Sequence, residues 1–292
     1  MKKQKLPSTH VSCQGACAAR LPFILWTMVF VAIPLLYILC MSFMKKAATW
    51  GILAEFSLDS YQKLFDPVYV KVFGQSMWLA FLTTVFTLLI GYPFAYFTSK
   101  LPPKWRSLVL LLIIVPFWTN SLVRIYGWMI LLRSQGVINS LLIMLGIIDS
   151  PLKLLYNFGA VLVGMVYALI PFMILSVYNS IAKLDPALVE ASRDLGASRW
   201  RAFWTVTVPM TRAGIMAGCV LVFIPSVGLF FVSDLLGGAK TMLLGNLIKN
   251  ELLTARNWPM GAALSIVMMT MTMIVIGIYK KVSGEKSLEG IV

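Results

Sequence analysis

The segment KLDPALVEASRDLGASRWRAFWTVTVP, residues 183–209, is a polar stretch between two long apolar runs, and it carries its own helix start and stop signals. Asp185 can cap a helix, and Pro186 suits the first helical position, where an N–H would have no partner. Good helix formers follow, and Gly196 can adopt the left-handed conformation that ends many helices. Ser198 can cap a second helix. The segment therefore predicts a helix, a glycine turn and a second helix.

The sequence on both sides of this segment is typical of a membrane protein. The chain is 59% hydrophobic and only 12% charged, whereas a soluble domain carries about a quarter charged residues. We expect an all-α membrane protein, because lipid offers no partner for unpaired backbone groups. Six stretches approach or exceed the roughly 20 residues of a membrane helix, so the prediction is a polytopic bundle of six transmembrane helices. The predicted spans are 21–44, 76–98, 107–131, 158–182, 213–233 and 260–279.

The distribution of charge predicts the topology of these spans. An even number of spans leaves both termini on one side. If that side is the cytoplasm, it holds 15 of the 25 Lys and Arg residues, as the positive-inside rule expects. Membrane topology then accounts for most of the net charge of +14, and no nucleic-acid partner is expected. Residues 1–20 and 282–292 become cytoplasmic tails, and 21–281 the membrane domain. The first span is too long for a signal-peptide core and is interpreted as retained.

The predicted helix pair at 183–209 would form an exposed knob between the fourth and fifth spans. It combines an apolar face, made by Leu188, Ala191 and Leu195, with charged edges, made by Glu190, Arg193 and Asp194. A knob of this kind can seat in a groove of a soluble partner. The alternative, an ordinary amphipathic loop, accounts for the helices but gives no reason for a glycine and a proline at fixed distance on an inside loop.

This loop resembles the EAA loop of ABC import permeases, in which Glu-Ala-Ala is followed after three residues by Gly and nine residues later by Ile-x-Leu-Pro. Here the pattern reads Glu190-Ala191-Ser192, Gly196 and Val206-Thr207-Val208-Pro209. The resemblance implies a type I ABC importer permease fold, and a loop that docks on a separate nucleotide-binding subunit. The docking residues it implies are Glu190, Ala191, Ser192, Arg193, Asp194, Leu195, Gly196 and Pro209.

ATP chemistry is expected in another subunit. The chain contains no G-x-x-x-x-G-K-[ST] motif, whose backbone amides would cradle phosphate. We therefore expect a transport subunit that is not an enzyme and has no cofactor of its own, with ATP and Mg bound by the partner ATPase.

Two further stretches, VPFWTNSLVRIYG at 115–127 and GLFFVSDLLGGAK at 228–240, extend the likeness over nearly the whole chain. Together with ASRDLGAS at 191–198 they resemble the B-type permeases of spermidine/putrescine importers. The resemblance implies a bacterial inner-membrane protein that pairs with a homologous second permease, two ATPases and a periplasmic polyamine-binding protein.

A polyamine is a flexible polycation, so its path needs carboxylates and aromatic faces. The candidates are Trp118, Tyr126 and Trp128 on the third span, and Phe230, Phe231 and Asp234 at the end of the fifth. Because aromatic residues also gather at membrane interfaces, a belt or packing role stays open for each ring. Arg124 is the one charge inside a span, and such charges are usually paired or functional. Our hypothesis is that it pairs with an acid such as Asp234, or snorkels outward, and gates the pore.

Other functions find less support. An importer of another cation, an amino acid or an anion would share the loop motif. An ion-coupled secondary transporter needs intramembrane acids, and the predicted spans contain none. A membrane enzyme or a metal site lacks ligands, because His10, the only histidine, lies in the tail near Cys13 and Cys17 without a second ligand pair. Two short helices are also predicted. Residues 57–65 would lie on the outer surface, as a cap of the bundle or a partner surface, and residues 140–148 would be interfacial or re-entrant.

Overall fold

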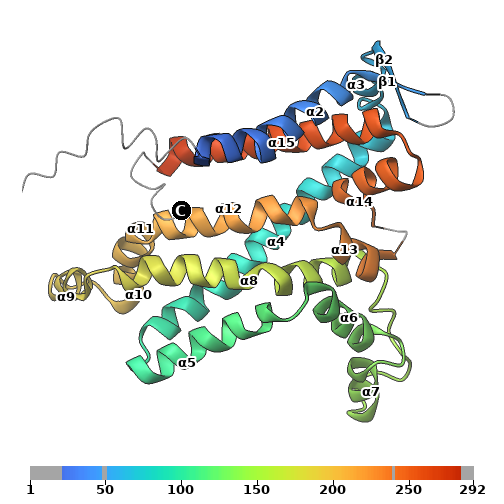
Figure 1. Ribbon diagram of the computed structural model, residues 1–292. Helices are drawn as coiled ribbons and strands as arrows, with labels where there is room; N and C mark the ends of the chain where they lie inside the picture. The colour runs from blue at the N-terminus through green and yellow to red at the C-terminus, as the bar shows by residue number, and fades with distance from the viewer. Residues whose placement is uncertain (1–21, 48–50, 239–240, 284–292) are drawn as a thin grey trace, which may run out of the picture.

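The computed structural model describes residues 22–47, 51–238 and 241–283, and helices dominate them (Figure 1). The elements in chain order are η1 (Met28–Ala32), α2 (Ile33–Ser42), β1 (Met44–Lys46), β2 (Ile52–Phe56), α3 (Asp59–Lys63), α4 (Pro67–Ser99), α5 (Pro103–Ile114), η2 (Val115–Trp118), α6 (Ser121–Leu132), α7 (Val137–Met144), α8 (Phe158–Ala182), α9 (Pro186–Asp194), α10 (Arg199–Ala202), η3 (Phe203–Thr207), α11 (Val208–Met210), α12 (Arg212–Gly228), α13 (Phe230–Val232), η4 (Ser233–Gly237), α14 (Leu244–Lys249), η6 (Asn250–Thr254) and α15 (Trp258–Ser283).

Among the described residues, five helical stretches are long and apolar enough to cross a bilayer. They are Pro22–Ser42, Pro67–Ser99, Ser121–Met144, Phe158–Ala182 and Trp258–Lys281. A sixth is obtained if Arg199–Met210 and Arg212–Gly228, which meet at 64°, count as one bent span. The expected all-α membrane fold is confirmed at this level. Individual bounds differ, since α4 begins at Pro67 and not at residue 76.

The expectation of one continuous helix over 107–131 is wrong. Helix α5 ends at Ile114, a single 3₁₀ turn that contains Pro116 follows, and the backbone is extended at Thr119. The proline ring removes an intrahelical hydrogen bond. The side chain of Asn120 then accepts a hydrogen bond from the Leu122 N–H at 2.8 Å and starts α6. A proline and a helix cap four residues apart therefore divide this stretch into two helices.

The expected fifth span, 213–233, is also interrupted. Helix α12 ends at Gly228, and Leu229 leaves the helical conformation. The chain then turns aside into α13 and η4 (Figure 1). This turn takes Phe230, Phe231 and Asp234 out of the axis of α12, which decides what they contact.

The centre of the bundle consists of α4, α8 and α12, and two glycines of α12 let it approach α8 closely. A Cβ added at Gly214 would lie 2.4 Å from the Cβ of Ser180, and one added at Gly218 would lie 2.6 Å from the Met173 Sδ. Ser176 on α8 donates a hydrogen bond to the Gly214 carbonyl at 2.9 Å. The GxxxG pair of the sequence therefore forms a helix contact, as such spacings do in membranes.

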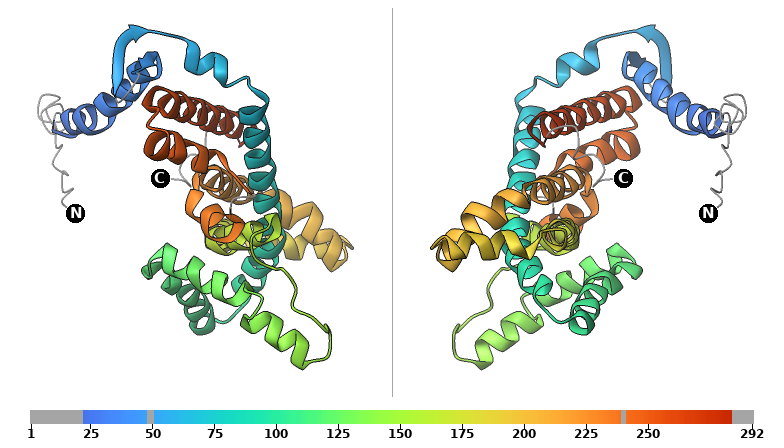
Figure 2. Two further views of the ribbon diagram at one scale, coloured as in Figure 1. Left: turned by 90° about the vertical axis from the view of Figure 1, so that its right-hand side faces the viewer. Right: turned by 90° about the vertical axis from the view of Figure 1, so that its left-hand side faces the viewer.

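The first helix lies at the edge of this bundle. Pro22–Ser42 runs beside α15 (Figure 2), and its apolar window has no buried residues. Beyond it, β1 and β2 form a small antiparallel hairpin that the sequence analysis did not predict, because the pairing register of such short strands has no strong local signal. The expected short helix at 57–65 is present as α3, and the Tyr61 and Ser42 hydroxyls share a hydrogen bond of 2.8 Å.

The expected tail 1–20, with His10, Cys13 and Cys17, lies outside the described residues, as does 284–292 of the expected C-terminal tail.

Candidate functional site

The predicted knob is present at one end of the bundle (Figure 1). The Asp185 side chain accepts a hydrogen bond from the Ala187 N–H at 3.0 Å and begins α9. Gly196 follows with a φ of +87°. The Ser198 hydroxyl accepts from the Arg201 N–H at 3.2 Å and begins α10. The two caps and the left-handed glycine are confirmed as the sequence predicted them.

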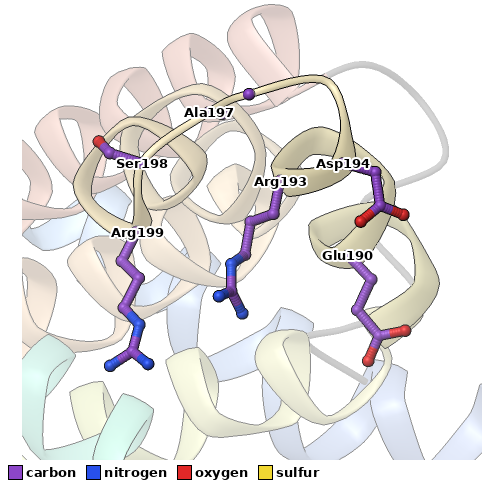
Figure 3. A pocket seen from close by; sticks show the side chains of 7 residues that line it. Glu190, Arg193, Asp194, Ala197, Ser198 and Arg199 are labelled. Atoms are coloured by element: carbon purple, nitrogen blue, oxygen red, sulfur yellow. The ribbon is translucent and has the colours of Figure 1, made fainter.

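The turn between α9 and α10 borders a hollow of about 520 Å³ whose walls are charged (Figure 3). It is lined by Glu190, Arg193, Asp194, Gly196, Ala197, Ser198 and Arg199. The side chains of Glu190, Arg193 and Arg199 extend in a similar direction, with Asp194 at the rim (Figure 3). Within the described part of the chain, none of these four charged groups forms an ion pair or a side-chain hydrogen bond. They are therefore available to groups on another molecule.

The structure gathers only some of the predicted docking residues at this hollow. Leu195 is 90% exposed beside it, and Ala191 is also exposed. The Ser192 hydroxyl donates to the Val189 carbonyl at 2.8 Å within α9. Pro209 lies in α11, at the bend that leads into α12. The proline thus lies at the joint between knob and bundle, so the loop motif covers both the exposed turn and this bend.

An aromatic cluster attaches the knob to the bundle, and sequence reasoning missed it. The Phe203 ring packs edge-on against Tyr92 and Tyr96 of α4, with centroid distances of 5.7 and 5.2 Å. It also meets Trp200 and Trp204 at 6.0 and 5.4 Å. Edge-to-face pairs of this kind are each worth about 0.5–1.5 kcal/mol beyond area burial. The cluster therefore joins α10 and η3 to α4. The signal in the sequence was the run of aromatic residues after Ser198.

The bend itself is also tied to α4. The Tyr92 and Thr211 hydroxyls share a buried hydrogen bond of 3.0 Å. Beside it, α4 and α10–η3 border an apolar groove of about 540 Å³, lined mainly by aromatic and aliphatic side chains. These contacts join α10, η3 and the bend to the end of α4 that carries Tyr92 and Tyr96.

The opposite end of the bundle holds Asp234, and its surroundings differ from those expected. Lys249 on α14 places its Nζ 2.5 Å from Asp234 Oδ2. The Asn246 amide donates to Asp234 Oδ1 at 2.5 Å and to the Phe230 carbonyl at 3.0 Å. Lys249 Nζ also lies 5.6 Å from the centroid of the Phe230 ring. Asp234 and Phe230 thus lie together beside the Lys249 ammonium, in contact with two α14 residues, Asn246 and Lys249, that were not among the predicted residues.

The hypothesis that Arg124 pairs with Asp234 is wrong, because Lys249 occupies that carboxylate. The Arg124 guanidinium lies over the Phe117 ring, 4.5 Å from its centroid, and 6.0 Å from that of Tyr167. Its Nε atom is buried and has no hydrogen-bond partner among the described residues. Arg124 is therefore held by aromatic faces within this chain and not by an acid.

The remaining predicted path residues are dispersed. Trp118 is 79% exposed at the break between α5 and α6, and Tyr126 is exposed on α6. Trp128 packs edge-on against Tyr167 at 5.5 Å. Trp128 and Phe231 both pack on the same buried apolar cluster. The structure therefore brings Trp128 and Phe231 together as packing residues, while Trp118 and Tyr126 face outward.

Comparison with known proteins identifies the class. The chain matches the family model "Binding-protein-dependent transport system inner membrane component" over residues 88–284. It therefore belongs to the family of inner-membrane permease components of binding-protein-dependent transport systems. Within that class it is similar to the spermidine/putrescine transport system permease protein PotB of Salmonella typhimurium (strain SL1344), at 47% identity over 258 residues, covering 88% of this chain and 90% of that protein. PotB of Escherichia coli (strain K12) is 46% identical over 258 residues, covering 88% and 94%.

Solved structures show the same fold. This chain superposes with a TM-score of 0.74 on a chain of a bacterial ABC transporter involved in the import of the acidic polysaccharide alginate. The two sequences are 18% identical, and the match covers 92% of this chain and 96% of that chain. An amino acid ABC transporter gives a TM-score of 0.51, also at 18% identity. The chain therefore has the type I ABC importer permease fold.

Proposed function

We propose that this chain is the polyamine-translocating permease subunit of an ATP-driven importer and forms the membrane path with a second permease. The observation that carries the proposal is the 46–47% identity to spermidine/putrescine permeases over 88% of the chain. The structure supports a cationic substrate, because Asp234 and Phe230 already hold an ammonium group, that of Lys249. A carboxylate and an aromatic face are what a polycation needs.

The knob is proposed to dock on a separate ATPase that binds ATP and Mg. Support comes from the unpaired charges around the hollow at Glu190–Arg199 and from the exposed Leu195 and Trp200 beside them. An apolar anchor surrounded by charged groups suits a soluble partner. Closure of two ATPases would push on the knob, and the Phe203 cluster would pass that movement to α4.

The membrane orientation is proposed from the charge distribution. Both termini and the knob would face the cytoplasm of a bacterial inner membrane, and Asp234 would face a periplasmic binding protein that delivers the polyamine. Substituted-cysteine labelling tests this. A cysteine at Ala191 should react only after the cytoplasmic side is opened, and one at Lys153 should react from outside.

The function is tested by reconstituting this permease with its partner permease, ATPase and binding protein in proteoliposomes. We expect ATP-dependent uptake of labelled spermidine or putrescine that unlabelled polyamines compete away and amino acids do not. Uptake of an amino acid or an anion in place of polyamine would refute the substrate assignment while leaving the permease class intact.

A further inference from the structure

The apolar groove between α4 and α10–η3 borders a part of α4 that is exposed on the surface of the bundle. Its volume of about 540 Å³ lies within the usual size of ligand sites, about 300–1,000 Å³. Leu89 and Phe97 line the groove and are 63% and 68% exposed. Since α4 is long and apolar enough to cross a bilayer, an exposed apolar side chain on it meets lipid. The groove can therefore take up an apolar chain from the membrane.

Two cationic side chains stand where α4 ends beside the knob. Arg199 is the only charged residue among the described residues that line the groove. The Lys100 ammonium is held at Tyr96, another lining residue, by a hydrogen bond of 2.6 Å to the hydroxyl and by the ring, whose centroid is 4.0 Å away. Neither cation forms an ion pair within the described part of the chain. The mouth of the groove is thus basic, while its walls are apolar.

Two tryptophans locate this mouth at the boundary between lipid and water. Trp200 and Trp204 line the groove, are 72% and 60% exposed, and both pack on Phe203. Exposed indole rings are typical of the membrane–water interface, where the ring meets acyl chains and the N–H meets headgroups. The groove therefore runs from the hydrocarbon layer to the headgroup layer.

We propose that this groove is a binding site for one anionic phospholipid. Its occupant must be apolar beside Leu89 and Phe97 and anionic beside Lys100 and Arg199, and an anionic phospholipid has both properties at this depth. Basic pockets between helices on the cytoplasmic side of a membrane suit anionic headgroups, and the planar guanidinium of arginine matches phosphate geometry. A lipid in this place contacts both α4 and α10–η3, so it helps to hold the knob on the bundle. From the proposed function the inference takes only the membrane orientation, and it goes beyond transport of the substrate.

Photolabelling of the fully assembled importer tests the site. The complex is placed in phosphatidylcholine nanodiscs that contain a little phosphatidylglycerol with a diazirine in its acyl chain, or phosphatidylcholine with the same labelled chain. Peptide mass spectrometry should find residues 88–97 and 200–215 labelled more by the phosphatidylglycerol probe, by about fivefold for each cation that it meets. Phe81 and Phe86 are exposed on α4 outside the lining of the groove and should be labelled equally by both probes.

Variants separate the headgroup contact from the acyl-chain contact. Lys100→Gln should lower labelling of the groove by the phosphatidylglycerol probe about fivefold and leave labelling by the phosphatidylcholine probe unchanged. It is preferred to a variant of Arg199, which also borders the hollow of the knob. Lys104→Gln removes an exposed lysine on the next helix, α5, and is the matched control. Ile215→Trp enlarges a lining residue and should lower labelling by both probes.

Equal labelling of the groove by the two probes, or an equal loss in Lys100→Gln and Lys104→Gln, would overturn the lipid site. A groove that neither probe labels in the assembled importer would also overturn it, because a partner subunit would then cover this surface. Polyamine uptake by the same wild-type complex is measured in parallel. Its absence would overturn the proposed substrate and leave the lipid site standing, so the two failures are distinct.

Discussion

Gly196 provides a test of the docking proposal in which the energy can be worked from the backbone. Its φ is +87°, and a Cβ at this position would meet nothing within 4 Å. A side chain there therefore adds no clash with neighbouring elements, and the cost is only that of the left-handed backbone. For an L-residue this is about 1–2 kcal/mol, and a β-branched residue is among the least tolerant. Gly196→Val should thus lower the equilibrium constant for the present turn conformation, relative to its alternatives, by roughly 5- to 30-fold.

The expected result is a fall of similar size in the affinity of the permease complex for its ATPase subunit, measured by titration in detergent or nanodiscs. Gly196→Asn should recover most of the affinity, because Asn enters the left-handed region more easily. Gly146→Val is the matched control, since Gly146 also has positive φ and an open Cβ position but lies beyond α7, away from the knob. Wild-type affinity in Gly196→Val, or an equal loss in Gly146→Val, would refute the reasoning.

Four other substitutions give three separate predictions. Gly214→Ala should lower the thermal stability of the purified protein more than Gly218→Ala, because the new Cβ would lie 2.8 Å from a backbone oxygen at position 214 but against a flexible methionine side chain at position 218. Overpacking of this kind costs about 1–3 kcal/mol. The reverse order of melting temperatures would contradict this packing. Phe203→Ala should preserve ATPase binding but lower transport per ATP hydrolysed, since it removes the ring that joins the knob to α4; unchanged coupling would exclude that link. Arg124→Gln should change uptake kinetics without preventing assembly, because its charge is held by aromatic faces and not by an acid; wild-type kinetics would remove the gating role.

The sequence predicted what depends on neighbours along the chain. The helices and the turn of the knob could be predicted in detail, because they depend on hydrogen bonds and dihedral angles within three residues of Asp185, Gly196 and Ser198. The hydropathy of Phe158–Ala182 predicted α8 with its observed bounds, because burial in lipid acts on each residue of a helix. The end of α12 at Gly228 could not be predicted in this way, because the apolar run continues past the residue at which the helix ends.

The partner of Asp234 was decided only by the tertiary structure. Arg124 and Lys249 are both cationic and both lie far from Asp234 along the chain. No short-range sequence pattern shows which of the two pairs with this acid. The choice follows from the contact of α14 with Gly228 and Ser76, which brings Lys249 to the carboxylate while Arg124 is taken up by Phe117 and Tyr167. Helices and turns are thus determined by interactions a few residues apart, but the pairing of charges depends on how whole helices pack, and a single sequence carries no local signal for that.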